Sequence, residues 1–278
     1  QPAPAQVGVW LPTYSLWRRE LVRFLRQPSR IVGLLSAPFL FWLVLGSGLG
    51  TSFRPDAAAG AAAGAAAAGS GFLQYFFPGS IVMVVLFTSI FSNMSTIEDR
   101  RDGYLMSMLA SPMPRVSIVL GKILGGTTQA MIPGMLFVLL APLAGVPLSA
   151  RAVGEAAFIL FLTAFSLNGF GLVIAWQMES TQGFHAVLNL LLMPMWMLSG
   201  SVFPTSGASG WVRWLMALNP LSYEVHALRS ALIPSTPALA QPFAVNGPLA
   251  TEITVGFSLL ILVACVTLCG RPSERNYT

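Results

Sequence analysis

Long apolar runs separated by short polar or charged segments dominate the chain. A membrane-spanning helix needs about 20 mainly apolar residues, at 1.5 Å of rise per residue. Six runs approach this length, and each is expected to be helical because hydrocarbon offers no partner for unpaired backbone groups. The six predicted spans are residues 31–49, 72–97, 118–143, 156–176, 184–203 and 253–270.

One further apolar run, residues 57–71, consists almost entirely of Ala and Gly. It lacks the large apolar side chains of a span, and its Gly content is typical of a flexible linker. We therefore expect a loop here rather than a seventh span.

Apolar and basic positions before the first predicted span recur with the period of a helix. The apolar positions are Trp17, Leu21, Phe24 and Pro28, and the basic ones are Arg18, Arg19, Arg23 and Arg26. This pattern predicts an amphipathic helix in the membrane interface, with guanidinium groups reaching the lipid headgroups. Two roles stay open for it: anchoring alone, or anchoring combined with contact to a cytoplasmic partner.

Residues 204–250 fit neither a full span nor a water-soluble domain. Two short apolar helical pieces are separated there by Asn219-Pro220, and Tyr223, Glu224 and Arg229 follow. An Asn-Pro break between such pieces predicts a re-entrant or interfacial helix pair at the outer surface.

Composition agrees with a membrane protein. Of the 278 residues, 55% are hydrophobic and 9% are charged, whereas soluble domains carry roughly a quarter charged residues. The net charge is +5, but the basic residues gather at span ends and form no groove with aromatics, so nucleic acid is not expected as a partner. With the N-terminus inside, eleven of the 15 Lys and Arg residues lie on the inner side. Both termini are therefore predicted to be cytoplasmic.

Motifs for chemistry are missing. A phosphate-binding loop needs G-x-x-x-x-G-K-[ST], but Gly121-Lys122 is followed by Ile123. Two Cys and two His residues do not make a metal site, so we predict no cofactor and no metal in this chain. No carboxylate lies deep inside a predicted span, which argues against an ion-driven carrier. The polar, Pro-rich start predicts no cleavable signal peptide.

The segment after the second predicted span, residues 98–112, is the most informative loop. Its first half is charged, and its second half is a short amphipathic helix that ends at Pro112. Leu105, Met108 and Leu109 would be exposed unless something covered them, and either lipid headgroups or a protein groove would serve.

The chain resembles the permease subunits of ABC transporters of the type-2 exporter class, most nearly drug-resistance and lipo-oligosaccharide or polysaccharide export permeases. Three ordered stretches carry the resemblance: residues 98–122 with Gly103, Ser111-Pro112 and Gly121-Lys122, residues 198–204 with Leu198-Ser199-Gly200 and Phe203-Pro204, and residues 218–229 with Leu218-Asn219-Pro220-Leu221. The resemblance covers about residues 15–270. It implies an all-α membrane fold with six spans, an N-terminal interface helix and a re-entrant pair before the last span.

The resemblance also implies roles for particular residues. The loop would be a coupling helix in a cleft of a separate ATPase, with polar contacts from its charged half and groove filling by its leucines and methionine. The implied coupling residues are Glu98, Asp99, Arg100, Arg101, Gly103, Leu105, Met108, Leu109 and Pro112. The implied interface helix contains Trp17, Arg18, Arg19, Leu21, Arg23 and Phe24. The implied outer gate contains Phe203, Pro204, Asn219, Pro220, Tyr223, Glu224 and Arg229.

By this resemblance the chain is divided into a cytoplasmic segment (1–30), a transmembrane domain (31–270) and a cytoplasmic tail (271–278). It would be half of the membrane unit of an ATP-driven exporter in the inner membrane of a prokaryote. Two permease chains, pairing across the first and fifth spans, would bind two ABC ATPase subunits that hold ATP and magnesium. The cargo would be a drug-like molecule, a lipid or a lipid-linked glycan.

Two other classes of function are weaker. A secondary carrier or channel would be expected to show intramembrane carboxylates or inverted repeats. A membrane enzyme or assembly factor acting on lipid or haem would need paired His, Cys or carboxylate residues near one membrane face.

Overall fold

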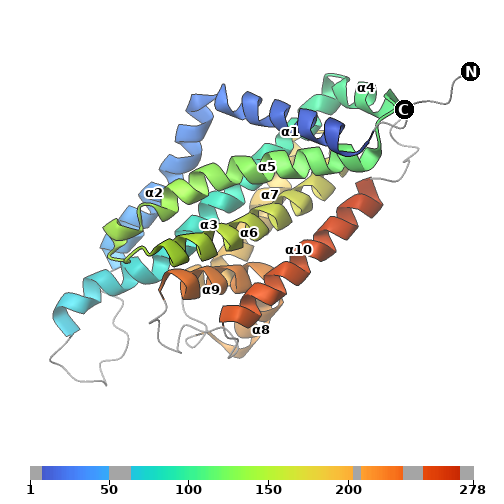
Figure 1. Ribbon diagram of the computed structural model, residues 1–278. Coiled ribbons are helices and arrows are strands. Elements are labelled where there is room, and N and C mark those ends of the chain that lie inside the picture. Colours follow the sequence, from blue (N-terminus) through green and yellow to red (C-terminus); the bar gives the residue numbers. More distant parts are fainter. Residues whose placement is uncertain (1–7, 50–63, 203–207, 234–246, 270–278) are drawn as a thin grey trace, which may run out of the picture.

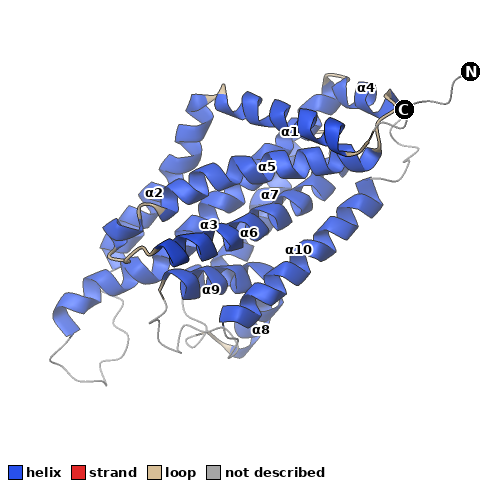
Figure 2. Cartoon of the chain, in the orientation of Figure 1, coloured by secondary structure: helices blue, strands red, loops and turns tan. Residues whose placement is uncertain are grey.

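A computed structural model describes residues 8–49, 64–202, 208–233 and 247–269, and this part of the chain is built from helices (Figures 1 and 2). Long helices run side by side between two ends of the bundle (Figure 1). We call them the α4 end, which also carries α1, and the α9 end, which also carries α8. The elements are α1 (Trp10–Leu25), α2 (Pro28–Leu49), α3 (Gly64–Arg101), α4 (Tyr104–Ala110), α5 (Arg115–Val138), the 3-10 turn η1 (Ala141–Ala144), α6 (Ala150–Gln177), α7 (Thr181–Trp196), the π-helical turn η2 (Met197–Ser201), α8 (Gly210–Leu218), α9 (Pro220–Leu232) and α10 (Gly247–Cys269).

Local sequence signals set several helix boundaries. The hydroxyls of Ser149 and Ser180 accept hydrogen bonds from the backbone N–H groups at the starts of α6 and α7, as N-cap residues do. Asn219 caps α9 in the same way, with Pro220 in the first turn. Gly103 separates α3 from α4 with a φ of +73°, a backbone region that glycine adopts without a steric penalty.

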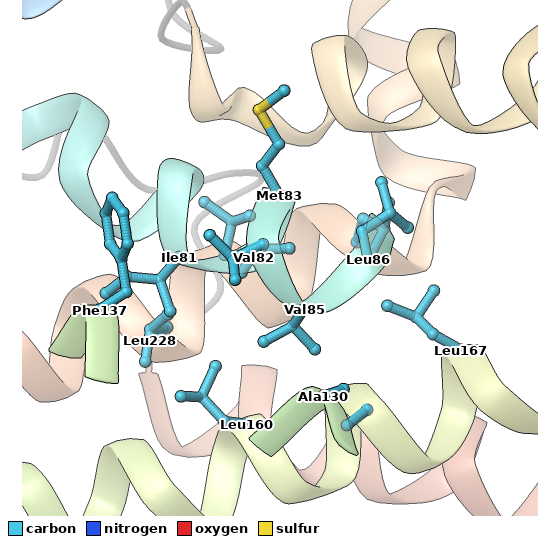
Figure 3. Close-up of a cluster of buried hydrophobic side chains, with 14 of the residues drawn as sticks. Ile81, Val82, Met83, Val85, Leu86, Ala130, Phe137, Leu160, Leu167 and Leu228 are labelled. Carbon is cyan, nitrogen blue, oxygen red and sulfur yellow. The ribbon is translucent and has the colours of Figure 1, made fainter. Parts of the chain in front are cut away.

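Helix α3 is the centre of the bundle. The middle of the helix, from Phe76 to Leu86, is almost entirely buried. Figure 3 shows side chains of α3 meeting Ala130 and Phe137 of α5, Leu160 of α6 and Leu228 of α9. A helix that is apolar on every side belongs in the interior of a bundle or a membrane, so the other helices are arranged around α3.

Four helical segments of the described chain are long and apolar enough to cross a membrane: Leu73–Arg101, Ala150–Gln177, Thr181–Ser201 and Gly247–Leu268. The other two predicted spans fall on α2 and α5. Helix α2 contains a shorter apolar stretch, Ile31–Val44, and α5 has 24 residues but includes Lys122 and Gln129. The all-helical membrane architecture is therefore confirmed, while the number of six spans stays a prediction.

The sequence-based prediction of a loop at residues 57–71 is wrong for its second half. Residues 64–71 form the first turns of α3, and residues 57–63 lie outside the described chain. Alanine has the highest helix propensity, and extending an existing helix avoids the cost of nucleating a new one. The Ala-rich tract therefore continues the helix that follows it.

The region predicted as a re-entrant pair contains two short helices. Helix α8 has 9 residues and α9 has 13, which correspond to about 14 and 20 Å of length. Neither reaches the thickness of about 30 Å that a hydrocarbon core requires. The predicted gate residues Phe203 and Pro204, like the tail at 271–278, lie outside the described residues.

Candidate functional site at the α4 end

Helix α1 is fixed to α5 by close packing against two glycines. A Cβ atom at Gly121 would lie 2.7 Å from the Cβ of Leu16, and one at Gly125 would lie 2.8 Å from the Cβ of Glu20. The Trp17 indole Nε1 donates a hydrogen bond of 2.9 Å to the Thr128 hydroxyl. These contacts leave no room for a side chain at Gly121 or Gly125, and α1 is a packed part of the bundle.

Three charged side chains from three helices meet beneath α1. We call Glu20 of α1, Asp99 of α3 and Lys122 of α5 the buried ion cluster. The Lys122 ammonium donates to a Glu20 oxygen at 2.7 Å, to Asp99, and to the Ser95 hydroxyl at 3.2 Å. All three charged side chains are less than 5% exposed. Two carboxylates and one ammonium leave one excess negative charge inside the cluster.

Arginines of α1 neutralise that excess charge from the solvent side. The guanidinium of Arg19 pairs with Asp99 and lies 3.9 Å from the centre of the Tyr104 ring. Arg23 pairs with Glu98 at 2.6 Å. Burial acts to lower the pKa of Arg19, but its hydrogen bond and attraction to Asp99 outweigh this effect and raise the pKa. Together these contacts connect α1 to the end of α3 and the start of α4.

The orientation of α1 differs from the predicted one. Its buried side chains are Thr13, Leu16, Glu20 and Phe24, whereas the sequence indicated an apolar face through Trp17, Leu21 and Phe24. The buried face differs from the predicted one because it includes Glu20, which pairs with a buried cation. A prediction that counts only apolar positions cannot place a charged residue on the buried face. The helix also ends at Leu25, and Pro28 begins α2.

Helix α4 also faces the protein. Leu105 is 2% exposed and Met108 is 4% exposed, and both pack with Leu16, Ile118 and the half-buried Leu109. Groove filling in another subunit stays a prediction for the half-buried Leu109, but the expectation that Leu105 and Met108 are exposed is wrong. They are covered by α1 and α5 of the same chain. The outward side of α4 carries Tyr104, Met106 and Ser107 instead.

The two arginines at the end of α3 bind the connection between α6 and α7. Arg100 donates to the carbonyl oxygens of Trp176 and Met178 at 2.5 and 3.1 Å, and Arg101 donates to that of Glu179 at 3.2 Å. Cations near the last carbonyls of a helix are favourable. These contacts hold α6 to the α3–α4 turn, so the charged half of residues 98–112 is largely engaged within the chain.

An open cleft of about 990 Å³ lies between α1 and the α3–α4 turn. Its lining is rich in arginine and contains two tyrosines: Tyr14, Arg18, Arg19, Arg23, Arg26 and Tyr104. Arg18 and Arg26 are exposed. The cleft and the outward side of α4 form one continuous surface, which we call the α4 surface.

The predicted gate residues lie at the opposite end, where they hold η2. The Asn219 amide donates to the Met195 carbonyl at 2.5 Å, and Arg229 donates to the Gly200 carbonyl at 3.0 Å. Gly200 has a φ of +75°, and the Tyr75 hydroxyl donates to the same carbonyl at 2.7 Å. Tyr223 donates to the Ala217 carbonyl at 2.9 Å. Arg229 and Tyr75 thus bind a carbonyl group of the π-helical turn, Asn219 binds one just before it in α7, and Tyr223 binds one near the end of α8.

Glu224 differs from the other gate residues. It is fully buried, and no hydrogen-bond partner is found for either carboxyl oxygen within the described residues. Burial raises its pKa to about 8, and a contact with the Thr163 hydroxyl opposes this rise. Within the described residues no group of three or more His, Cys, Asp or Glu side chains could hold a metal ion.

These features place the chain in a class: an all-helical integral membrane protein whose N-terminal helix and the loop after α3 pack together at one end. Its family follows from comparison with known sequences. Residues 12–233 match the ABC-2 type transporter family, and the chain belongs to this family. Helix α10 lies beyond the matched residues.

Two relatives illustrate the similarity. The inner membrane transport permease YadH of Escherichia coli strain K12 is 22% identical over 271 residues, which cover 96% of each chain. Nodulation protein J of Neorhizobium galegae is 24% identical over 233 residues, which cover 82% of this chain and 80% of the relative. The chain is therefore a transport permease, and the predicted family is confirmed.

Proposed function

We propose that this chain is the membrane subunit of an ATP-driven exporter and that a separate ABC ATPase docks on the α4 surface. The observation that carries the proposal is that the buried ion cluster joins α1, α3 and α5 while α4 packs against α1 and α5. Leu105 and Met108 pack α4 against α1 and α5, and Lys122 joins α1, α3 and α5, so a force on α4 would be passed through this packing to α3 and α5. ATP and magnesium would be held by the ATPase.

The chemistry of the α4 surface suits a protein partner. Arg18 and Arg26 offer positive charge to acidic side chains, and Tyr104 and Met106 are both about 40% exposed. Aromatic residues, methionine and arginine are enriched at protein interfaces. On this proposal the α4 end faces the cytoplasm of a prokaryotic cell, as the distribution of basic residues predicts.

A second copy of the chain would complete the transport path. Helix α7 is an apolar span, yet Leu190 is 80% exposed and the neighbouring Asn189 is also exposed. Phe41 of α2 packs edge-on against Trp196 of α7, so the two helices share one side of the bundle. Polar side chains in spans usually form hydrogen bonds across helix interfaces. We propose a homodimer across this side, with α8 and α9 as the outer re-entrant pair and two ATPases below.

The cargo on this proposal is hydrophobic or amphipathic. The exposed side chains of α2 and α7 that would face the path are Phe41, Leu43, Val187, Leu190 and Met193. Such a wall suits a drug-like molecule, a lipid or a lipid-linked glycan.

Docking can be tested with a single charge on the α4 surface. Met106→Asp places a carboxylate at an exposed apolar position of α4, and we expect ATPase retention in affinity purification of the co-expressed complex to fall at least fivefold. Leu218→Asp, at an exposed leucine of α8, is the matched control and should retain the ATPase. Unchanged retention with Met106→Asp, in a variant that inserts and purifies normally, would contradict docking at this surface.

A further inference from the structure

A cleft of about 560 Å³ opens between α6, α9 and α10 towards the α9 end. Phe158, Ile159 and Val255 give it apolar walls. Glu155 and Glu252 contribute negative charge to the lining, and Arg151 pairs with Glu155 at 2.7 Å. The cleft therefore has one carboxylate more than it has cations.

Polar side chains lie deeper in the bundle, about one helical turn beyond the lining of this cleft. Ala227 and Ala231 line it on α9, and Glu224 stands three and seven positions before them, on the same helix face. Ile159 lines it on α6, and Thr163 follows four positions later. The buried polar residues below the cleft, which we call the polar seam, are Thr163, Ser166, Glu224, Thr254 and Ser258.

Some side chains of the polar seam have hydrogen-bond partners and others do not. The hydroxyls of Ser166 and Ser258 share a hydrogen bond of 2.6 Å across α6 and α10. Among the described residues no hydrogen-bond partner is found for either Glu224 oxygen or for the Thr163 hydroxyl. A buried polar group without a partner costs about 1–3 kcal/mol. Buried ionisable groups near a cleft are candidates for functional sites, and Glu224 has the Thr163 hydroxyl beside it but no cation partner among the described residues.

We propose that this cleft binds an amphipathic organic cation, with Glu224 as the counter-ion of its ammonium or phosphonium group. The excess carboxylate in the lining attracts a cation and repels an anion. Phe158 presents an aromatic ring that can contact the charged group, and the apolar walls cover the hydrophobic part of the ligand. The cation enters as the Glu224 carboxyl releases its proton to water, so total charge is conserved.

This inference deepens the proposed function, because it names the class of cargo or regulator that an exporter of this kind would hold at its α9 end. Binding itself is a property of this chain and needs neither ATP nor the ATPase. Failure of the cation site would leave docking on the α4 surface intact, and failure of docking would leave the cation site intact.

The test uses the full chain in nanodiscs of zwitterionic phosphatidylcholine, with radiolabelled tetraphenylphosphonium as the cation. We expect saturable binding to the unmodified protein and at least tenfold weaker binding to Glu224→Gln, which keeps the shape and removes the charge. Neutral triphenylphosphine oxide should bind both proteins equally. Glu179→Gln, an exposed carboxylate on the α6–α7 connection, is the matched control and should bind the cation like the unmodified protein.

Proton release gives a second readout. In weakly buffered solution near pH 7, cation binding should release close to one proton per cation from the unmodified protein and none from Glu224→Gln. The other charged or titratable side chains on α9 and its neighbours near this end are unchanged in the variant: Tyr75, Arg151, Glu155, Arg213, Tyr223, His226, Arg229 and Glu252. The difference between the two proteins therefore isolates Glu224.

Equal cation affinity of the unmodified protein and Glu224→Gln would overturn the proposal, as would the absence of saturable binding to the unmodified protein. If Glu224→Gln fails to fold, Thr163→Val replaces it. This variant removes the hydroxyl beside the carboxyl and should weaken cation binding without affecting the neutral compound. Unchanged cation binding by a folded Thr163→Val protein would then overturn the proposal.

Discussion

The two ends of the bundle both bury charged side chains, but the ends differ in the partners that these side chains have. At the α4 end, Lys122 lies between the carboxylates of Glu20 and Asp99, and Arg19 pairs with Asp99 from outside. At the α9 end, Glu224 is just as deeply buried, and no hydrogen-bond partner is found for its carboxyl oxygens among the described residues. At the α4 end both buried carboxylates have cation partners, and at the α9 end Glu224 has none among the described residues.

The difference indicates different roles. A buried ion pair with further hydrogen bonds costs a great deal when one partner is removed, so it holds helices in one arrangement. A carboxyl without a partner contributes no such restraint, but it can accept a proton or a cation. The buried ion cluster therefore suits the transmission of force from α4, and Glu224 suits the binding of a ligand.

The strongest test of this comparison removes the central cation of the α4 end. Lys122→Met keeps the length of the side chain but leaves Glu20 and Asp99 buried without their shared partner. We expect a loss of about 3–5 kcal/mol in the free energy of unfolding, measured as a lowered Tm and shorter lifetime in detergent.

The control for this variant is an exposed ion pair. Arg151→Met removes a partner of Glu155 on the surface of α6, where the Arg151 side chain is 88% exposed, and surface ion pairs contribute little to stability. Equal thermal stability of Lys122→Met and Arg151→Met would show that the buried ion cluster does not hold the α4 end together.

The α9 end is tested through the pH dependence of its stability. Burial raises the pKa of Glu224 to about 8, far above the value of about 4.3 for an exposed glutamate. A group whose pKa is raised by folding stabilises the protein fully below its unfolded pKa, and this contribution is lost as pH rises towards the folded pKa. Between about pH 4.3 and 8 the unmodified protein should therefore lose about 1.4 kcal/mol per pH unit relative to Glu224→Gln.

The measurement is the Tm of both proteins from pH 5 to pH 9. We expect the Tm of Glu224→Gln to rise above that of the unmodified protein as pH increases, and the two to converge in acid. Parallel curves over the whole range would mean that Glu224 titrates as an exposed group, which would remove the contrast between the two ends.

The fold could be predicted from the sequence to a large extent, because apolar run length and helix signals are local properties. The positions of α3, α6, α7 and α10 follow from such runs, and α9 begins at the Asn219-Pro220 signal. The Ala-rich start of α3 was missed because its composition also suits a linker. The high helix propensity of alanine makes such a tract helical only where it can extend a helix that is already stable.

The chemistry of the α4 end was less predictable, because it depends on contacts between residues far apart in the chain. Glu20, Asp99 and Lys122 lie 23 to 102 positions apart, and the apolar pattern of each helix says nothing about which charge meets which. The only local signal for Glu20 is its spacing with Leu16 and Phe24. The same pattern made Leu105 and Met108 look available to a partner, although α1 and α5 of the same chain cover them.

The smallest expected effect tests whether the α4 end is close-packed as well as ion-paired. Gly121→Ala places a Cβ 2.7 Å from that of Leu16 and 3.2 Å from the Thr13 carbonyl oxygen, and overpacking of this kind costs about 1–3 kcal/mol. The higher helix propensity of alanine offsets up to about 1 kcal/mol of this cost, so the net loss in the free energy of unfolding should be about 1 kcal/mol and the Tm should fall.

The control is Gly256→Ala in α10, where nothing lies within 4 Å of the new Cβ. This variant gains the helix propensity of alanine without a steric clash. Its Tm should stay equal or rise. A fall of the same size in both variants would mean that glycine is needed for reasons other than the approach of α1 to α5, and the α4 end would then depend on its ion cluster alone.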